Sequence, residues 1–138
     1  MSDHTQPQKL LLAGFHPLLV EDSHLQSASP YDIVTATADE KILLPAVEHL
    51  SPDFVLLDLL YASSLRSIRR IRAIKPSCRV VAVVSTRRQD VADSIFLCGA
   101  SGILHRSDAA SELLLAIRTV SSGQQFLSST LMKCFSRQ

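Results

Sequence analysis

Short runs of apolar residues alternate along the chain with longer stretches in which apolar residues recur every three or four positions. The runs lie at residues 9–13, 31–36, 54–58, 79–85 and 101–105. Short apolar runs bounded by turn residues are typical of strands buried on both faces of a parallel sheet. Strands that alternate with helices across short connections predict an α/β fold. We therefore expect a doubly wound, five-stranded parallel sheet with five helices.

The stretches between the runs have the spacing of amphipathic helices. They are expected at residues 16–28, 40–50, 65–74, 91–97 and 109–121. Pro17 suits the first turn of the first helix, because the N–H that proline lacks has no partner at that position. Pro45 lies inside the second pattern, so that helix either begins near Pro45 or is kinked there. Gly99 and Gly123 are expected to end the last two helices.

Composition and charge narrow the class of protein. The 138 residues are 46% hydrophobic and 20% charged, which predicts one globular domain with a core that needs no disulfide. A formal net charge of +1 does not indicate the overall basic character that is typical of proteins that bind nucleic acid. Cys78, Cys98 and Cys134 lack metal-ligand spacing and read as reduced thiols. The polar N-terminus and the absence of a long apolar run favour a cytoplasmic protein with no membrane segment.

One carboxylate, Asp58, ends the central apolar run. Open α/β sheets bind their ligands outside the carboxyl ends of the strands, so Asp58 is a candidate site residue. A single aspartate after a strand is more often a helix cap or a loop residue. Asp58 therefore counts as evidence for a functional site only if the residues around it support one. The sequence has no nucleophile elbow, zinc-protease motif or glycine-rich phosphate loop. An enzyme of another class is therefore not expected.

Four stretches carry a resemblance to the response-regulator receiver (CheY-like) family. They are His-Pro-Leu at 16–18, Pro-Asp-Phe-Val-Leu-Leu-Asp-Leu at 52–59, Ile-Arg-Arg-Ile-Arg at 68–72 and Gly-Ala-Ser-Gly at 99–102. With Phe-Leu-Ser at 126–128, they most resemble the branch that carries a LuxR-type DNA-binding domain. The resemblance implies a CheY/flavodoxin-like receiver domain at 9–123. Residues 1–8 would be an N-terminal tail, and residues 124–138 a C-terminal tail or the start of a linker.

The resemblance also assigns the residues of a phosphorylation switch. A receiver accepts a phosphoryl group on the aspartate that ends strand three, here Asp58. An acidic pair after strand one holds Mg²⁺, but that pair falls on Gly14 and Phe15. Because neither residue offers a carboxylate, we expect no metal site and no cofactor. An alternative places the acidic pair at Glu21 and Asp22, after a strand at residues 19–20, which leaves little room for a first helix.

The remaining switch positions also depart from the family pattern. The lysine after strand five falls on Arg106, whose planar guanidinium is not equivalent to a compact ammonium group. The aromatic of strand five falls on Ile103. The serine or threonine that ends strand four falls on Val84 by ungapped counting, or on Ser85 if the next loop is one residue shorter.

These departures predict an atypical receiver that works independently of phosphorylation in signal transduction or transcription regulation, through protein–protein interaction or dimerisation. The alternative is a conventional phosphoacceptor that a histidine kinase phosphorylates on Asp58. A third hypothesis is a small-molecule-binding receiver whose crevice has Phe15 as an apolar wall. The simpler interpretation, that Phe15 plugs the vacated site, is favoured over this one. The expected partners are proteins: a histidine kinase, the chain's own effector domain, or a second copy in a homodimer. Direct contact with nucleic acid or a membrane is not expected.

Overall fold

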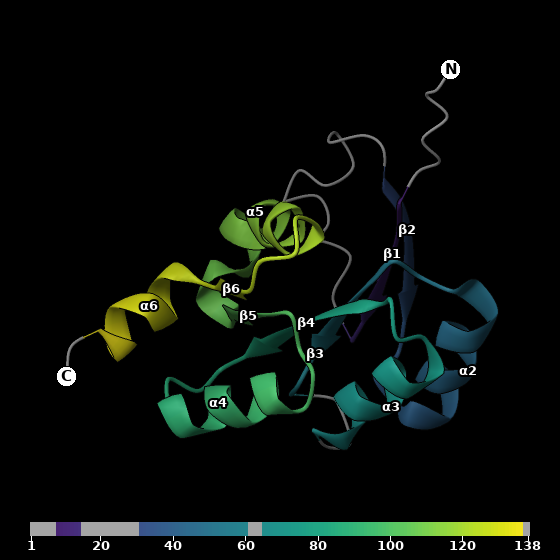
Figure 1. Ribbon diagram of the computed structural model, residues 1–138, viewed down its shortest axis with the longest axis horizontal. Coiled ribbons are helices and arrows are strands. Elements are labelled where there is room, and N and C mark those ends of the chain that lie inside the picture. The colour runs from purple at the N-terminus through teal and green to yellow at the C-terminus, as the bar shows by residue number, and fades with distance from the viewer. Residues whose placement is uncertain (1–7, 15–30, 61–64, 137–138) are drawn as a thin grey trace.

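A single parallel sheet forms the centre of the computed structural model, which describes residues 8–14, 31–60 and 65–136. The strand order is β2-β1-β3-β4-β5-β6 (Figure 1). The strands are β1 (Gln8–Ala13), β2 (Tyr31–Ala36), β3 (Phe54–Asp58), β4 (Arg79–Val84), β5 (Gly102–His105) and β6 (Phe126–Leu127). The helices are α2 (Glu40–Leu50), α3 (Arg66–Ile74), α4 (Gln89–Leu97), the 3₁₀ helix η1 (Arg106–Asp108), α5 (Ala109–Ser121) and α6 (Ser129–Phe135).

The prediction of a parallel α/β sheet is confirmed, and the prediction of five strands is wrong. The sixth strand, β6, pairs in parallel with β5, Phe126 with Gly102 and Leu127 with Ile103. A two-residue strand has no periodicity of its own, and it forms here because its neighbours supply the pairing. The structure describes five α-helices, of which α6 was not predicted. The first expected helix, at residues 16–28, lies outside the described residues.

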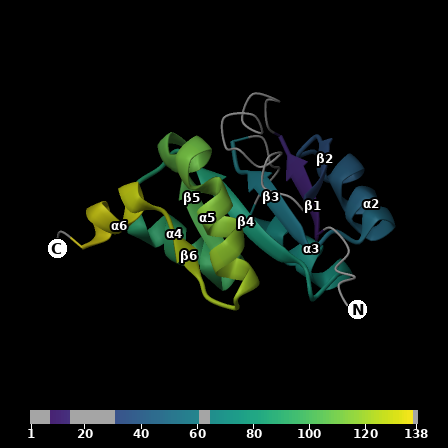
Figure 2. The same cartoon turned by 90° about the horizontal axis from the view of Figure 1, so that it is seen from above.

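Helices cover both faces of the sheet, which explains why the strands are apolar on both sides. On one face, α2, α3 and α4 pack through residues such as Leu43, Ile71 and Ile95. On the other face, α5 packs through Leu113 and Ile117 (Figures 1 and 2). Successive strand residues point to opposite faces, so both faces need apolar side chains. None of the helices in these described ranges is long and apolar enough to span a membrane.

The helix α2 begins at Glu40, the first residue of the range predicted for it. The side chain of Asp39 accepts a hydrogen bond from the Lys41 amide at 3.0 Å and so caps the first turn. The helix then continues through Pro45 to Leu50. The hypothesis that the helix begins near Pro45 is therefore wrong.

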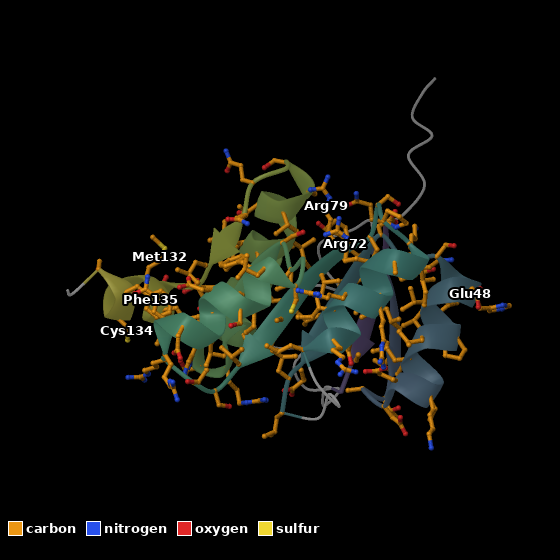
Figure 3. The ribbon with its side chains drawn as sticks, turned by 60° about the horizontal axis from the view of Figure 1, so that its bottom comes forward. Glu48, Arg72, Arg79, Met132, Cys134 and Phe135 are labelled. Carbon is orange, nitrogen blue, oxygen red and sulfur yellow. The ribbon has the colours of Figure 1, made fainter. Side chains whose placement is uncertain are left out.

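The C-terminal segment runs along the β5 edge of the sheet and then crosses to the α4 face. Phe126 is 7% exposed and packs with the α5-side core. Leu131 and Phe135 of α6 pack with the opposite core, and Met132 is 56% exposed (Figure 3). Thus residues 126–135 pack against the domain on both sides of the sheet. The boundary placed at residue 123 stays a prediction.

Close backbone approach at β6 explains a glycine in β5. A Cβ atom at Gly102 would lie 3.1 Å from the Cβ atom of Phe126 and 3.3 Å from Cγ1 of Val120. Contacts this short require the neighbours to move. The glycine at position 102 therefore lets both β6 and α5 lie against the start of β5.

Two arginines, Arg72 and Arg79, link helices to neighbouring segments through hydrogen bonds to backbone carbonyls (Figure 3). Arg72 of α3 donates to the carbonyl oxygens of Gly99 at 2.7 Å and Pro76 at 3.1 Å. Arg79 of β4 donates to the carbonyl oxygen of Val120 at the end of α5. Both guanidinium groups thus bind backbone carbonyls at or just beyond helix ends.

Candidate functional site

Asp58 lies at the carboxyl end of β3, between β1 and β4. All five residues of β3 are buried, and the side chain of Asp58 is only 1% exposed. Its Oδ1 atom accepts a hydrogen bond from the Leu60 amide at 3.0 Å. The position predicted from the apolar run is therefore where the structure places this carboxylate. A buried charge of this kind needs a partner.

Arg106 is that partner. Its Nη2 atom lies 2.5 Å from Oδ1 of Asp58, and its Nη1 atom lies 3.0 Å from Oδ2. Arg106 is the first residue of η1 and follows β5 directly, which brings its side chain to the same edge of the sheet. A planar guanidinium matches a carboxylate with two parallel hydrogen bonds, the strong geometry for this ion pair. Both carboxylate oxygens of Asp58 are thus bound by one arginine.

Ser85 completes the arrangement from the end of β4. Its hydroxyl oxygen accepts a hydrogen bond from Nε of Arg106 at 3.1 Å. Val84 points into the core on the α4 side and is 5% exposed. Of the two residues considered for the serine or threonine position, Ser85 is the one whose hydroxyl reaches the ion pair. Ile103 is fully buried in the same core as Val84.

Among the described residues, this edge does not present the acidic pair that would hold the Mg²⁺ expected of a receiver. Gly14 follows β1 with φ +93°, a conformation that favours glycine, and its amide donates to the Ala36 carbonyl at 3.0 Å. It offers no side-chain oxygen, whereas Mg²⁺ requires an octahedral set of oxygen ligands. Within the described residues, no group of three or more His, Cys, Asp or Glu side chains could hold a metal. Phe15, which was considered as a wall or a plug of the crevice, lies outside the described residues.

The alternative acidic pair at Glu21 and Asp22 rested on a strand at residues 19–20. The strand between β2 and β3 is instead β1, with Leu10 opposite both Ile33 and Phe54. That alternative assignment of the first strand is therefore wrong. Glu21 and Asp22 themselves lie outside the described residues.

A hydrogen-bond network that the sequence did not predict links this site to the C-terminal segment. It begins at His105, the last residue of β5, which is 8% exposed. The His105 ring contacts the Ser85 carbonyl through Nε2 at 3.2 Å and the Ser107 hydroxyl through Nδ1 at 2.8 Å. The His105 amide donates to Oγ of Ser128 at 2.8 Å, just before α6. One residue therefore contacts both the end of β4 and the start of α6.

Acidic side chains at the start of α5 then cap α6. The first amides of a helix lack intrahelical partners, and Ser128 does not cap them with its side chain. Asp108 instead accepts hydrogen bonds from the amide and the hydroxyl of Thr130, both at 2.9 Å. Glu112 accepts one from the Ser129 amide at 3.1 Å. The cap of α6 is thus supplied by residues about twenty positions earlier in the chain.

Hydrogen bonding also sets the charge state of Asp108. Burial tends to raise the pKa of Asp108, but the hydrogen bonds from Thr130 and Ser128 outweigh burial and hold that pKa below its usual value. The ionised carboxylate therefore favours the docked position of α6. No spacing rule connects position 108 with position 130, so only the sheet topology reveals this contact.

Comparison with solved structures identifies the architecture. A LuxR-family two-component response regulator from Aurantimonas sp. SI85-9A1 superposes with a TM-score of 0.80 at 24% identity, over 95% of this chain and 96% of that chain. The isolated REC domain of RcsB from Salmonella enterica serovar Typhimurium superposes with a TM-score of 0.79 at 16% identity, over 94% of this chain and 99% of that chain. The chain has the fold of a response-regulator receiver domain. The resemblance inferred from the four motifs is thus confirmed for the fold.

A third receiver agrees with this assignment. The non-phosphorylated receiver domain of the stress response regulator RcsB from Escherichia coli gives a TM-score of 0.77 at 17% identity, over 90% of this chain and all of that chain. No protein-family model and no curated protein sequence matches the chain. Similarity at these identities is a similarity of fold, so the function has to be argued from the site.

Proposed function

We propose that the chain is an atypical receiver module of a signal-transduction or transcription-regulating protein, which acts without phosphorylation of Asp58. It works through contact with other proteins, either its own effector domain or a second copy of the chain. The observation that carries this proposal is the pair of hydrogen bonds by which Arg106 binds both oxygens of Asp58. We assign the chain no enzymatic activity and no cofactor.

The ion pair opposes phosphorylation in two ways. A phosphoacceptor must present a carboxylate oxygen to the incoming phosphoryl group, and each oxygen of Asp58 is held in a charge-assisted hydrogen bond. Phosphoryl transfer also depends on positive charge placed to stabilise the transferred oxygens, usually the largest contribution to the rate. Arg106, which lies at this edge, already neutralises Asp58. The donor set for a divalent metal is missing at Gly14.

The same contacts support a structural role for the pair. Arg106 joins the end of β3 to the end of β4 through Asp58 and Ser85, and it stands at the end of β5. His105, the preceding residue, reaches Ser128 at the start of α6. The pair therefore stabilises one arrangement of the strand ends and, through β5, one position of the C-terminal segment. In this proposal that position of α6 is the surface through which the module acts on its partner.

Intact-mass measurement tests the proposal. The protein is incubated with acetyl phosphate and Mg²⁺, and its mass is compared with that of Asp58→Asn treated in the same way. We expect no phosphoryl adduct on either protein. Arg106→Lys, with the compact ammonium group that the family carries, serves as the matched variant for the effect of the guanidinium.

A stoichiometric adduct on the unmodified protein that is lost in Asp58→Asn would contradict the proposal. It would instead support the conventional function, in which a histidine kinase phosphorylates Asp58 and Arg106 takes the place of the lysine. That alternative draws on the position of Asp58 at the end of β3 with a cation beside it. An adduct seen only with Arg106→Lys would show that the arginine is what prevents the reaction.

A further inference from the structure

A cavity of about 290 Å³ opens at the carboxyl edge of the sheet, next to the Asp58–Arg106 pair. Leu59 and Leu60 line it after β3, and Leu65 lines it before α3. Val84 at the end of β4 and Val91 in α4 form the opposite wall. Five aliphatic residues thus line a space, open to solvent on one side, at the edge where α/β proteins of this architecture bind their ligands.

The size of the cavity limits what it can hold. An aliphatic cavity of about 150 Å³ is large enough to bind benzene, and ligand sites begin at about 300 Å³. The present volume therefore suits a compact body of about two fused rings. Leu60 is 63% exposed, which is unusual for a large apolar side chain beside a cavity. An occupant that covers it would remove apolar surface from water, the main source of affinity for such ligands.

Ser85 and Thr86 are the polar residues among the described lining of the cavity. Ser85 accepts a hydrogen bond from Nε of Arg106 at 3.1 Å, and Thr86 accepts one from the Arg88 amide at 3.1 Å. A hydroxyl that accepts one hydrogen bond can still donate its own proton. These hydroxyl groups can therefore donate to an occupant, and none of the described residues that line the cavity is charged. This combination fits an uncharged ligand that carries a hydrogen-bond acceptor.

We infer that this cavity is a binding site for a small, uncharged, largely apolar compound of about two rings that bears a carbonyl oxygen. The carbonyl oxygen of the ligand accepts hydrogen bonds from the hydroxyl groups of Ser85 and Thr86. The apolar rings of the ligand lie among the leucine and valine side chains. Because Ser85 also anchors Arg106, the occupant contacts the group that holds the Asp58–Arg106 pair. The inference stands on the cavity itself and does not depend on whether Asp58 is phosphorylated.

Titration with two matched probes tests the inference. The ¹⁵N-labelled protein is titrated with 1-indanone, a two-ring ketone, and with indane, the same hydrocarbon without the oxygen. We expect saturable shifts at the amides of Leu60, Ser85, Thr86 and Val91. The dissociation constant of 1-indanone should be on the order of 1 mM or lower, a usual affinity for a ligand of ten or so atoms. Indane should bind several-fold more weakly.

Three variants distinguish binding in this cavity from nonspecific binding elsewhere on the protein. Val91→Phe fills the cavity and should weaken the binding of 1-indanone at least about tenfold. Leu97→Phe, on the exposed face of the same helix, should leave this affinity unchanged. Thr86→Val removes the hydroxyl donor while keeping the shape of the side chain. It should weaken the binding of 1-indanone roughly 3- to 10-fold and leave the binding of indane unchanged. The thermal transition of each free variant shows that it is folded.

The outcomes that overturn the inference are distinct. Absence of saturable shifts with both probes, or binding that Val91→Phe leaves intact, would show that the cavity is not a ligand site. Equal affinity for the ketone and the hydrocarbon, with no effect of Thr86→Val, would overturn the assigned class of ligand. None of these results changes the intact mass after acetyl phosphate treatment, so the proposed function is judged separately.

Discussion

Replacing Arg106 by methionine isolates the contribution of the ion pair to stability. Methionine keeps an unbranched apolar side chain and removes the charge and the three hydrogen bonds to Asp58 and Ser85. The carboxylate of Asp58, 1% exposed, then keeps only the Leu60 amide as a hydrogen-bond donor among the bonds described here. We therefore expect Arg106→Met to lower the free energy of unfolding substantially.

The structure sets the size of the effect. Removing one partner of a fully buried pair costs about 3–5 kcal/mol, because the other charge is left uncompensated. The Arg106 side chain is 39% exposed, so water can partly replace it beside Asp58 and the expected loss is about 2–3 kcal/mol. For a domain of this size each kcal/mol shifts Tm by roughly 3–5 °C, which predicts a decrease of about 6–15 °C.

Urea denaturation followed by circular dichroism measures the loss. The control is the double variant Asp58→Asn/Arg106→Met, in which no charge is left unpaired. We expect the double variant to recover about half or more of the stability that Arg106→Met loses, since removing both charges avoids the desolvation cost. A loss below about 0.5 kcal/mol for Arg106→Met, or a double variant no more stable than the single one, would refute the reasoning.

Two further predictions concern the C-terminal segment. The lowered pKa of Asp108 means that its contribution to α6 docking is present above about pH 4 and is lost as the pH falls through the folded-state value. The Thr130 amide resonance should report this undocking, and Asp108→Asn should remove the pH dependence; tighter docking in acid would contradict the assignment. Gly102→Ala should destabilise the protein by about 1–3 kcal/mol and speed hydrogen exchange at the Ser128 amide, because its Cβ atom meets Phe126. Unchanged exchange would show that β6 adapts.

The strands and the position of Asp58 could be predicted because their cause is local. Parallel strands buried on both faces need continuous apolar residues, and the run at 54–57 ends in a carboxylate where the strand ends. The helix at 109–121 was predicted with the bounds that the structure gives. In each case the pattern within about ten residues determines the element.

The site contacts could not be predicted because they join residues far apart in the chain. Asp58 and Arg106 are 48 positions apart, and their two-bond geometry depends on how η1 turns the chain after β5. The resemblance assigned Arg106 a position, but not its hydrogen bonds to both oxygens of Asp58. The strand β6 has only two residues, so its existence depends on space beside Gly102 rather than on its own sequence. The cap of α6 by Asp108 has the same long-range origin.

The shortness of β6 has a consequence for aggregation. A sheet edge with several unpaired backbone amides and carbonyls can pair with a strand of another molecule. β6 covers Gly102 and Ile103 of β5, is itself too short to offer a long template, and leads directly into α6. The chain thus ends its own sheet on this side, and variants that release β6 would be expected to expose β5 to pairing between molecules.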